Sequence, residues 1–111
     1  MDNQRQERIA RLLQKELGEM FITFEREKRG VIVSVSEVRV TSDMGLARVY
    51  LSVFPPQKTD EIVEFVQAET KSFRFNLGRR VKNQLRLVPQ LVFYRDDSIE
   101  KLERIDELLN K

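Results

Sequence analysis

The spacing of the apolar residues changes along the chain, from helical steps to alternation and back, and this order constrains the fold most strongly. From residue 3 to about residue 24 the apolar side chains recur every three or four positions, which predicts an amphipathic helix. Its apolar face consists of Ile9, Leu12, Leu13, Leu17, Met20, Phe21 and Phe24. We interpret the charged residues 25–29 that follow as a loop, and Gly30 ends this element.

The next part of the chain has the alternation of a β-hairpin. Residues 31–40 are dense in β-branched side chains, which favour strands, but the apolar parity changes between Val35 and Val38. A bulge near Ser36 and Glu37 would bring both sets of valines to the core side. Residues 41–45 have the composition of a turn, and residues 47–53 alternate regularly as a second strand.

Helical periodicity returns after the pair of prolines at 55 and 56, which ends the second strand. Thr59 is expected to cap the next helix, with Asp60 and Glu61 placed favourably in its first turn. The periodicity then continues from residue 62 to about residue 86, which is long for so small a domain. We therefore expect two helices with a break between them.

The end of the chain predicts one more strand and one more helix. Residues 91–94, after Pro89, suit a short edge strand, and Asp97 with Glu100 resembles a capping box for a helix over residues 99–109. The predicted order is α-β-β-α-α-β-α. We expect one α+β domain spanning residues 1–111, with helices packed on a small three-stranded sheet.

The composition excludes most catalytic chemistries. The 111 residues include no cysteine and no histidine, so disulfides, thiolate nucleophiles, zinc ligation by cysteine and the usual general base are all absent. Asp96 and Asp97 are adjacent carboxylates, which we interpret as a turn and a helix cap rather than a metal site. We expect no catalytic residues, metal or cofactor. The polar N-terminus and the lack of a long apolar run predict a cytoplasmic protein without membrane segments.

The net charge of +2 hides a strongly uneven distribution. Residues 70–95 contain seven basic residues and no acidic one, whereas residues 96–111 contain six acidic and three basic ones. At about 100° per residue, Lys71, Arg79, Lys82 and Arg86 fall within one sector of a helix. Phe75 lies in the same sector, away from a core-facing side formed by Phe73, Leu77, Val81 and Leu85.

This pattern is typical of a surface that contacts RNA, because cations pair with phosphates and an exposed ring stacks on an unpaired base. Gly78 lies beside the cations, where the missing side chain would let a backbone approach closely. The alternative is an ordinary solvated basic face. The candidate RNA-binding residues are Lys71, Arg74, Phe75, Gly78, Arg79, Arg80, Lys82 and Arg86.

Three segments carry a resemblance to a known family. They are RIARLLQKEL at residues 8–17, VRVTSD at 38–43 leading into ARVYLSV at 47–53, and LRLVPQLVF at 85–93 followed by DDSIE at 96–100. In this order and spacing the chain resembles ribosome-binding factor A, an assembly factor of the bacterial small ribosomal subunit. The resemblance covers residues 5–109.

The resemblance implies a type II KH-like fold and an RNA-binding function without catalysis. Family members bind the immature small subunit near the 5′-terminal helix of its RNA and support late RNA maturation, especially in the cold. We expect a monomer. The family has an Ala-x-Gly kink between two helices, and the aligned positions here are Lys71, Ser72 and Phe73. The alternative function is a protein–protein adaptor whose cationic helix docks on an acidic partner.

Overall fold

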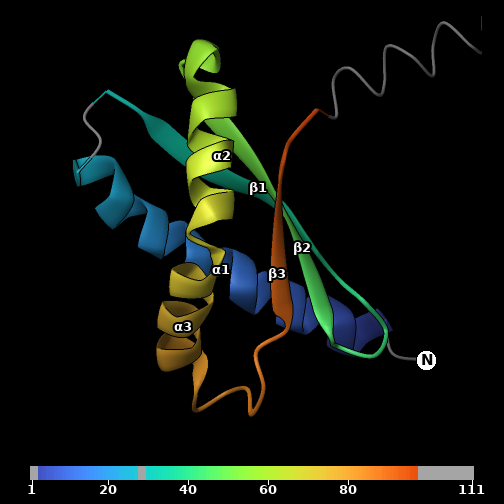
Figure 1. The fold of residues 1–111 in the computed structure, drawn as a ribbon. Coiled ribbons are helices and arrows are strands. Elements are labelled where there is room, and N and C mark those ends of the chain that lie inside the picture. The colour runs from blue at the N-terminus through green and yellow to red at the C-terminus, as the bar shows by residue number, and fades with distance from the viewer. Residues whose placement is uncertain (1–2, 28–29, 98–111) are drawn as a thin grey trace, which may run out of the picture.

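The structure, a computed structural model, describes residues 3–27 and 30–97 (Figure 1). Its elements are α1 (Asn3–Glu27), β1 (Ile32–Val40), β2 (Leu46–Phe54), the 3₁₀-helix η1 (Pro56–Lys58), α2 (Thr59–Ala68), α3 (Thr70–Val81) and β3 (Gln90–Arg95). This order confirms the predicted α+β class. The predicted closing helix over residues 99–109 lies outside the described residues, and so does Glu100 of its predicted capping box.

The three strands form one mixed sheet with β2 at its centre. β2 is antiparallel to β1 and parallel to β3, so β3 is an edge strand as predicted. The register of β1 shifts between Val35 and Glu37, which confirms the predicted bulge. Because of this shift, Val33 and Val38 are both buried although their positions differ in parity.

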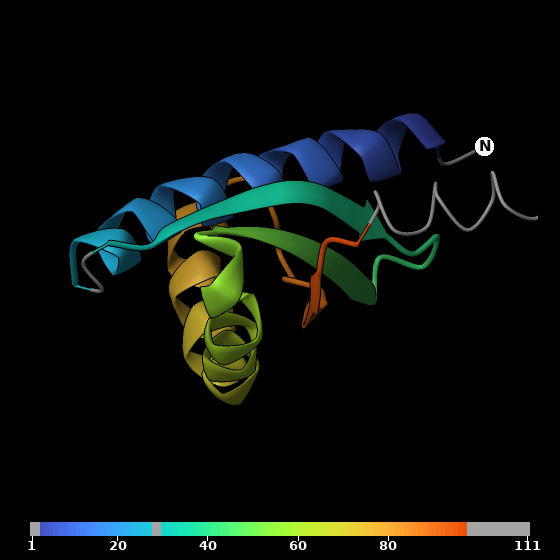
Figure 2. The same ribbon diagram turned by 90° about the horizontal axis from the view of Figure 1, so that it is seen from above.

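One hydrophobic core lies between the three helices and one face of the sheet. α1 runs along β1, while α2 and α3 follow each other with a bend between them (Figures 1 and 2). The largest fully buried side chains come from every layer of this arrangement. They are Phe21, Phe93, Leu13, Leu17, Leu51, Leu77, Val49, Val66 and Val81.

Glutamine side chains from the helices bind backbone groups at the two edges of the sheet. Gln14 of α1 donates to the Val35 carbonyl oxygen at 3.0 Å, and Gln67 of α2 donates to the Phe93 carbonyl oxygen at 2.9 Å. Both edge strands thus have carbonyl groups that are satisfied within the domain. These bonds fix α1 against β1 and α2 against β3.

The first helix is longer than predicted. α1 continues to Glu27, so the prediction of a loop from residue 25 was wrong. Glutamate and arginine are good helix formers, and residues 25–27 contain no residue that breaks a helix. Glu25 also has a partner across the loop, because its Oε1 accepts the N–H of Val33 at 2.7 Å.

The start of α2 differs from the prediction at Thr59. Thr59 is the first residue of the helix and not its cap, which is Lys58 without a side-chain capping bond. The reason is the 3₁₀-helix that leads directly into α2. The Thr59 hydroxyl donates to the Pro56 carbonyl oxygen at 2.7 Å and so binds back to η1. Asp60 and Glu61 do lie in the first turn, as expected.

The predicted break in the long helical region is confirmed, and it comes before the positions that align with the kink of the family. The break lies at Glu69, whose φ and ψ of −101° and 19° separate α2 from α3, and the helix runs unbroken through residues 71–73. α3 then ends at Val81 and not near Arg86. The eight residues between Val81 and β3 must lead the chain back to the sheet, and Pro89 disfavours helical backbone at Val88.

The turn between β1 and β2 is organised around a carboxylate. Asp43 Oδ1 accepts the Thr41 hydroxyl at 2.7 Å and the Gly45 N–H at 2.9 Å. The bond from Thr41 is the larger cause and that from Gly45 the next, and together they hold the pKa of the Asp43 carboxyl below its ordinary value. The charged form of Asp43 therefore stabilises the folded hairpin.

The lowered pKa of Asp43 predicts a pH-dependent part of the stability. This contribution is complete above the ordinary carboxyl pKa and is lost as the pH falls through the lowered value. We expect Asp43→Asn to be less stable than the natural protein near neutral pH, and the difference to shrink below about pH 4. Urea unfolding at a series of pH values measures it, and a difference that stays constant into the acid range would contradict this role.

Candidate nucleic-acid interface

Seven of the eight candidate RNA-binding residues line one hollow on the surface of α3. The hollow has a volume of about 570 Å³ and lies between α3 and the segment that follows it. We call its lining residues the basic hollow. They are Lys71, Arg74, Phe75, Gly78, Arg79, Lys82, Arg86, Leu87 and Val88.

Arg86 lines the basic hollow although it is not part of α3, so a helical projection does not predict its position. It lies beyond the end of α3, in the segment that leads to β3. Arg74 holds this segment against the helix, because its Nε donates to the Pro89 carbonyl oxygen at 3.1 Å and its Nη2 to that of Val88 at 2.6 Å. Arg74 thus has a structural task in addition to its charge.

Gly78 faces the same segment, with Val88 as its neighbour. A methyl group at this position would lie 3.5 Å from Cγ2 of Val88, which is ordinary van der Waals contact. The close neighbour of Gly78 in the structure is therefore the Val88 side chain. The absence of a side chain here leaves space at the bottom of the basic hollow.

The basic hollow combines exposed apolar groups with cations. The Phe75 ring is 66% exposed and Leu87 is 84% exposed, although both are large hydrophobic residues. The predicted outward position of Phe75 is confirmed. An exposed aromatic ring on a helix, with cations around it, is a surface on which an unpaired base can stack while its phosphates bind the cations.

Four cations of the basic hollow have no acidic partner among the described residues. Within residues 3–27 and 30–97, no carboxylate forms an ion pair with Lys71, Arg79, Lys82 or Arg86. Their charges repel one another and are not compensated locally, so a polyanion would relieve this repulsion. This uncompensated charge distinguishes the hollow from an ordinary solvated helix face, where opposite charges are interspersed.

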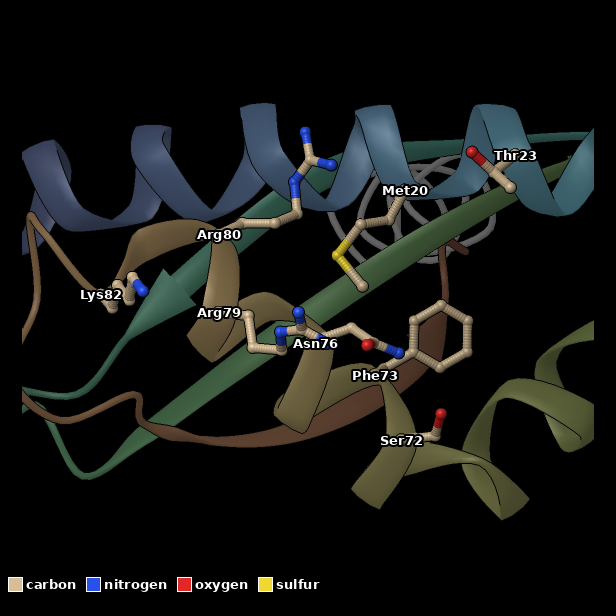
Figure 3. Close-up of a pocket in the computed structure, with 8 residues that line it drawn as sticks. All are labelled: Met20, Thr23, Ser72, Phe73, Asn76, Arg79, Arg80 and Lys82. Atoms are coloured by element: carbon tan, nitrogen blue, oxygen red, sulfur yellow. The ribbon is translucent and has the colours of Figure 1, made fainter.

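Arg80 is the one candidate residue that the structure places elsewhere. Its guanidinium turns toward α1, as Figure 3 shows. There it forms ion pairs with two carboxylates. Nε lies 2.9 Å from Glu16 Oε1, and Nη2 lies 2.7 Å from Glu19 Oε1. Arg80 therefore ties α3 to α1 and does not line the basic hollow.

This position predicts a structural effect of Arg80 that its neighbour Arg79 lacks. We expect Arg80→Ala to lower the free energy of unfolding by about 1 kcal/mol, since the two ion pairs are only partly exposed. Arg79→Ala, which removes an unpaired charge, should change it by less than about 0.5 kcal/mol. Urea unfolding compares the two variants. Equal losses, or no coupling between Arg80→Ala and Glu19→Gln in a double-mutant cycle, would contradict this assignment.

Leu87 and Val88 were not among the candidates, although they line the basic hollow. Their position depends on where α3 ends, which the periodicity did not show. The signal available in the sequence was the apolar pair directly before Pro89, outside the regular spacing of the helix.

Metal and membrane sites are not evident in the described parts of the chain. Across residues 3–27 and 30–97 no three acidic side chains come close enough to hold a metal ion. None of the helices in the same residues has the length and apolar character to span a membrane.

Comparisons with known proteins agree on one family. A family model described as ribosome-binding factor A matches residues 5–109. The ribosome-binding factor A of Flavobacterium psychrophilum is 44% identical over 112 residues, which cover 98% of this chain and 85% of that protein.

Solved structures show a similar fold. The crystal structure of ribosome-binding factor A from Thermus thermophilus aligns with a TM-score of 0.68 and 21% identity, over 81% of this chain and 94% of that chain. A Thermus thermophilus homology model, fitted into a cryo-EM map of a complex with the 30S subunit, aligns with a TM-score of 0.62 and 23% identity, over 75% of this chain and 86% of that one. The KH-like order of helices and strands is thereby confirmed.

Proposed function

The chain belongs to the ribosome-binding factor A family, and from this premise we propose that it binds the immature small ribosomal subunit through the subunit's RNA. The observation that carries this proposal is the basic hollow, with an exposed Phe75 and four cations that form no ion pair within residues 3–27 and 30–97. The complex named for the Thermus thermophilus relative supports the choice of partner.

The chemistry of the basic hollow suits a flexible RNA strand. Lys71, Arg79, Lys82 and Arg86 bind phosphates and release the counterions condensed on them, which supplies affinity without reading sequence. Phe75 provides a stacking surface for a base that is not paired. Helix α3 and the segment that Arg74 binds fix the backbone from which these side chains extend, so the backbone gains little further order on binding.

In the cell, the protein acts by occupying a site on the subunit, not by catalysis. We propose that residues 1–111 act as a single RNA-binding domain, a cytoplasmic monomer that contacts the region of the 5′-terminal helix. By holding this RNA during late assembly it supports processing, most of all in the cold, where RNA structures rearrange slowly. No cofactor is required for such a role.

Co-sedimentation tests the proposed partner. The protein should sediment with purified small subunits, and immature subunits should retain more of it than mature ones do. An adaptor that docks its cationic helix on an acidic protein should sediment neither with subunits nor with bare ribosomal RNA. That result would replace an RNA-binding function by the adaptor function.

Cells that lack the protein test its role in maturation. We expect small subunits from these cells, grown at low temperature, to contain ribosomal RNA with unprocessed ends. Restoring the natural protein should restore normal ends. RNA ends that are fully normal in the cold would contradict the assembly role, whatever the protein binds in solution.

A further inference from the structure

A second hollow, of about 560 Å³, lies between α1 and α3 (Figure 3). It shares Arg79 and Lys82 with the basic hollow, so the two are neighbours on the surface. We call its lining residues the interhelical groove. They are Met20, Thr23, Ser72, Phe73, Asn76, Arg79, Arg80 and Lys82.

The interhelical groove has an apolar floor that is held in place by the core. The ring centroid of Phe73 lies 5.1 Å from that of Phe21 and 5.6 Å from that of Phe93, so its orientation is fixed from within. Met20 extends from α1 into the same space in Figure 3. A fixed ring and a polarisable thioether are suited to a flat, unsaturated group.

The walls of the groove offer polar groups that have no partner among the residues that the structure describes. Within residues 3–27 and 30–97, the side chains of Thr23, Ser72 and Asn76 form no hydrogen bond with other protein groups. The Asn76 amide and the Phe73 ring both line the groove, three residues apart on α3 (Figure 3). An amide donates and accepts side by side, which matches the edge of a nucleobase.

The charge of the groove is concentrated at one end. Arg80 is neutralised by Glu16 and Glu19, whereas Arg79 and Lys82 form no ion pair in the parts of the chain that the structure describes. The uncompensated cations therefore lie where the groove meets the basic hollow. A phosphate bound there would be continuous with the phosphates along α3.

We propose that the interhelical groove holds one unstacked nucleotide of the RNA strand whose phosphates contact the basic hollow. Its base packs on Phe73 and Met20 with its edge on Asn76, and its phosphate lies at Arg79 and Lys82. This inference rests on the proposed RNA-binding function. An acidic peptide would match the cations, and its backbone would match the Asn76 amide, but a nucleotide combines a flat group, a donor–acceptor edge and an anion in one unit, so a nucleotide is favoured.

Methyl NMR of the methionines tests whether a base enters the groove. The probes are a short single-stranded RNA of mixed sequence and a strand of equal length made entirely of abasic sites. Met44, in the turn between β1 and β2, lines neither hollow and is an internal control. We expect the RNA to shift the Met20 methyl signal, and the abasic strand, with the same phosphates, to leave it in place.

A pair of asparagine variants provides the matched affinity test. Asn76→Ala should weaken binding of the base-containing strand by about fivefold, the value of one neutral hydrogen bond, and leave the abasic strand unaffected. Asn83→Ala, an exposed asparagine just after α3, should change neither. Both substitutions are at exposed positions, so the fold is retained.

Several results would overturn the groove assignment. They are an equal Met20 shift with both strands, RNA binding without any Met20 shift, and a larger shift with an acidic peptide of glutamate and phenylalanine than with RNA. Failure of the natural protein to sediment with small subunits is a separate result, because it contradicts the proposed function. A base-dependent Met20 shift in the same protein would still support the groove.

Discussion

Replacing Arg79, Lys82 and Arg86 together with alanine should weaken binding to small subunits on the order of 100-fold near physiological salt. Each lost phosphate contact removes roughly 0.7 to 0.9 from the slope of log affinity against log salt. The three side chains line the basic hollow and form no ion pair in the described residues. Binding measured at several salt concentrations gives both the affinity and the slope.

The control for this variant removes the same charge from another surface. Arg5, Arg8 and Arg11 are exposed on the first turns of α1, and their replacement by alanine leaves the basic hollow intact. If binding depended only on net charge, the two triple variants would lose affinity equally. Equal losses, or unchanged binding of the folded Arg79, Lys82 and Arg86 variant, would rule out the basic hollow as the contact site.

Local patterns were sufficient for most of the elements because their physical causes are local. The parity change between Val35 and Val38 required an extra residue in β1, and the structure has the bulge there. Pro55 and Pro56 ended the second strand for an equally local reason. Periodicity could not show where α3 ends. The helix stops at Val81 since the chain must return to the sheet beside β2, and this requirement is not local.

In the candidate site, too, features with a local cause could be predicted and features that depend on distant residues could not. Exposure of Phe75 follows from its own angle on the helix, and the structure confirms it. Arg80 directly follows Arg79 in the same basic stretch. The position of its side chain, however, depends on Glu16 and Glu19, more than sixty residues earlier in the chain. No helical projection of residues 70–86 contains that information. The same holds for Met20, whose apolar spacing indicated only the core.

Phe21→Ala should cause the largest loss of stability, about 3 to 5 kcal/mol in the free energy of unfolding. Phe21 is fully buried at the crossing of α1 with the rest of the core. Its ring centroid lies 5.9 Å from that of Phe24 and 5.1 Å from that of Phe73. The substitution leaves a cavity and also removes two aromatic contacts, each worth up to about 1.5 kcal/mol beyond burial.

Ile22, the next residue, is a control of similar size on the same helix. It is 51% exposed, so Ile22→Ala should change the free energy of unfolding by less than about 0.5 kcal/mol. Urea unfolding of both variants measures the difference, and a loss below about 1 kcal/mol for Phe21→Ala would contradict the packing described for α1. A domain of this size has a stability of about 5 to 15 kcal/mol, so the Phe21 variant loses a large part of it.

Phe21 also supports the ring of Phe73. Its loss should therefore weaken RNA binding through the groove floor while the cations of the basic hollow remain.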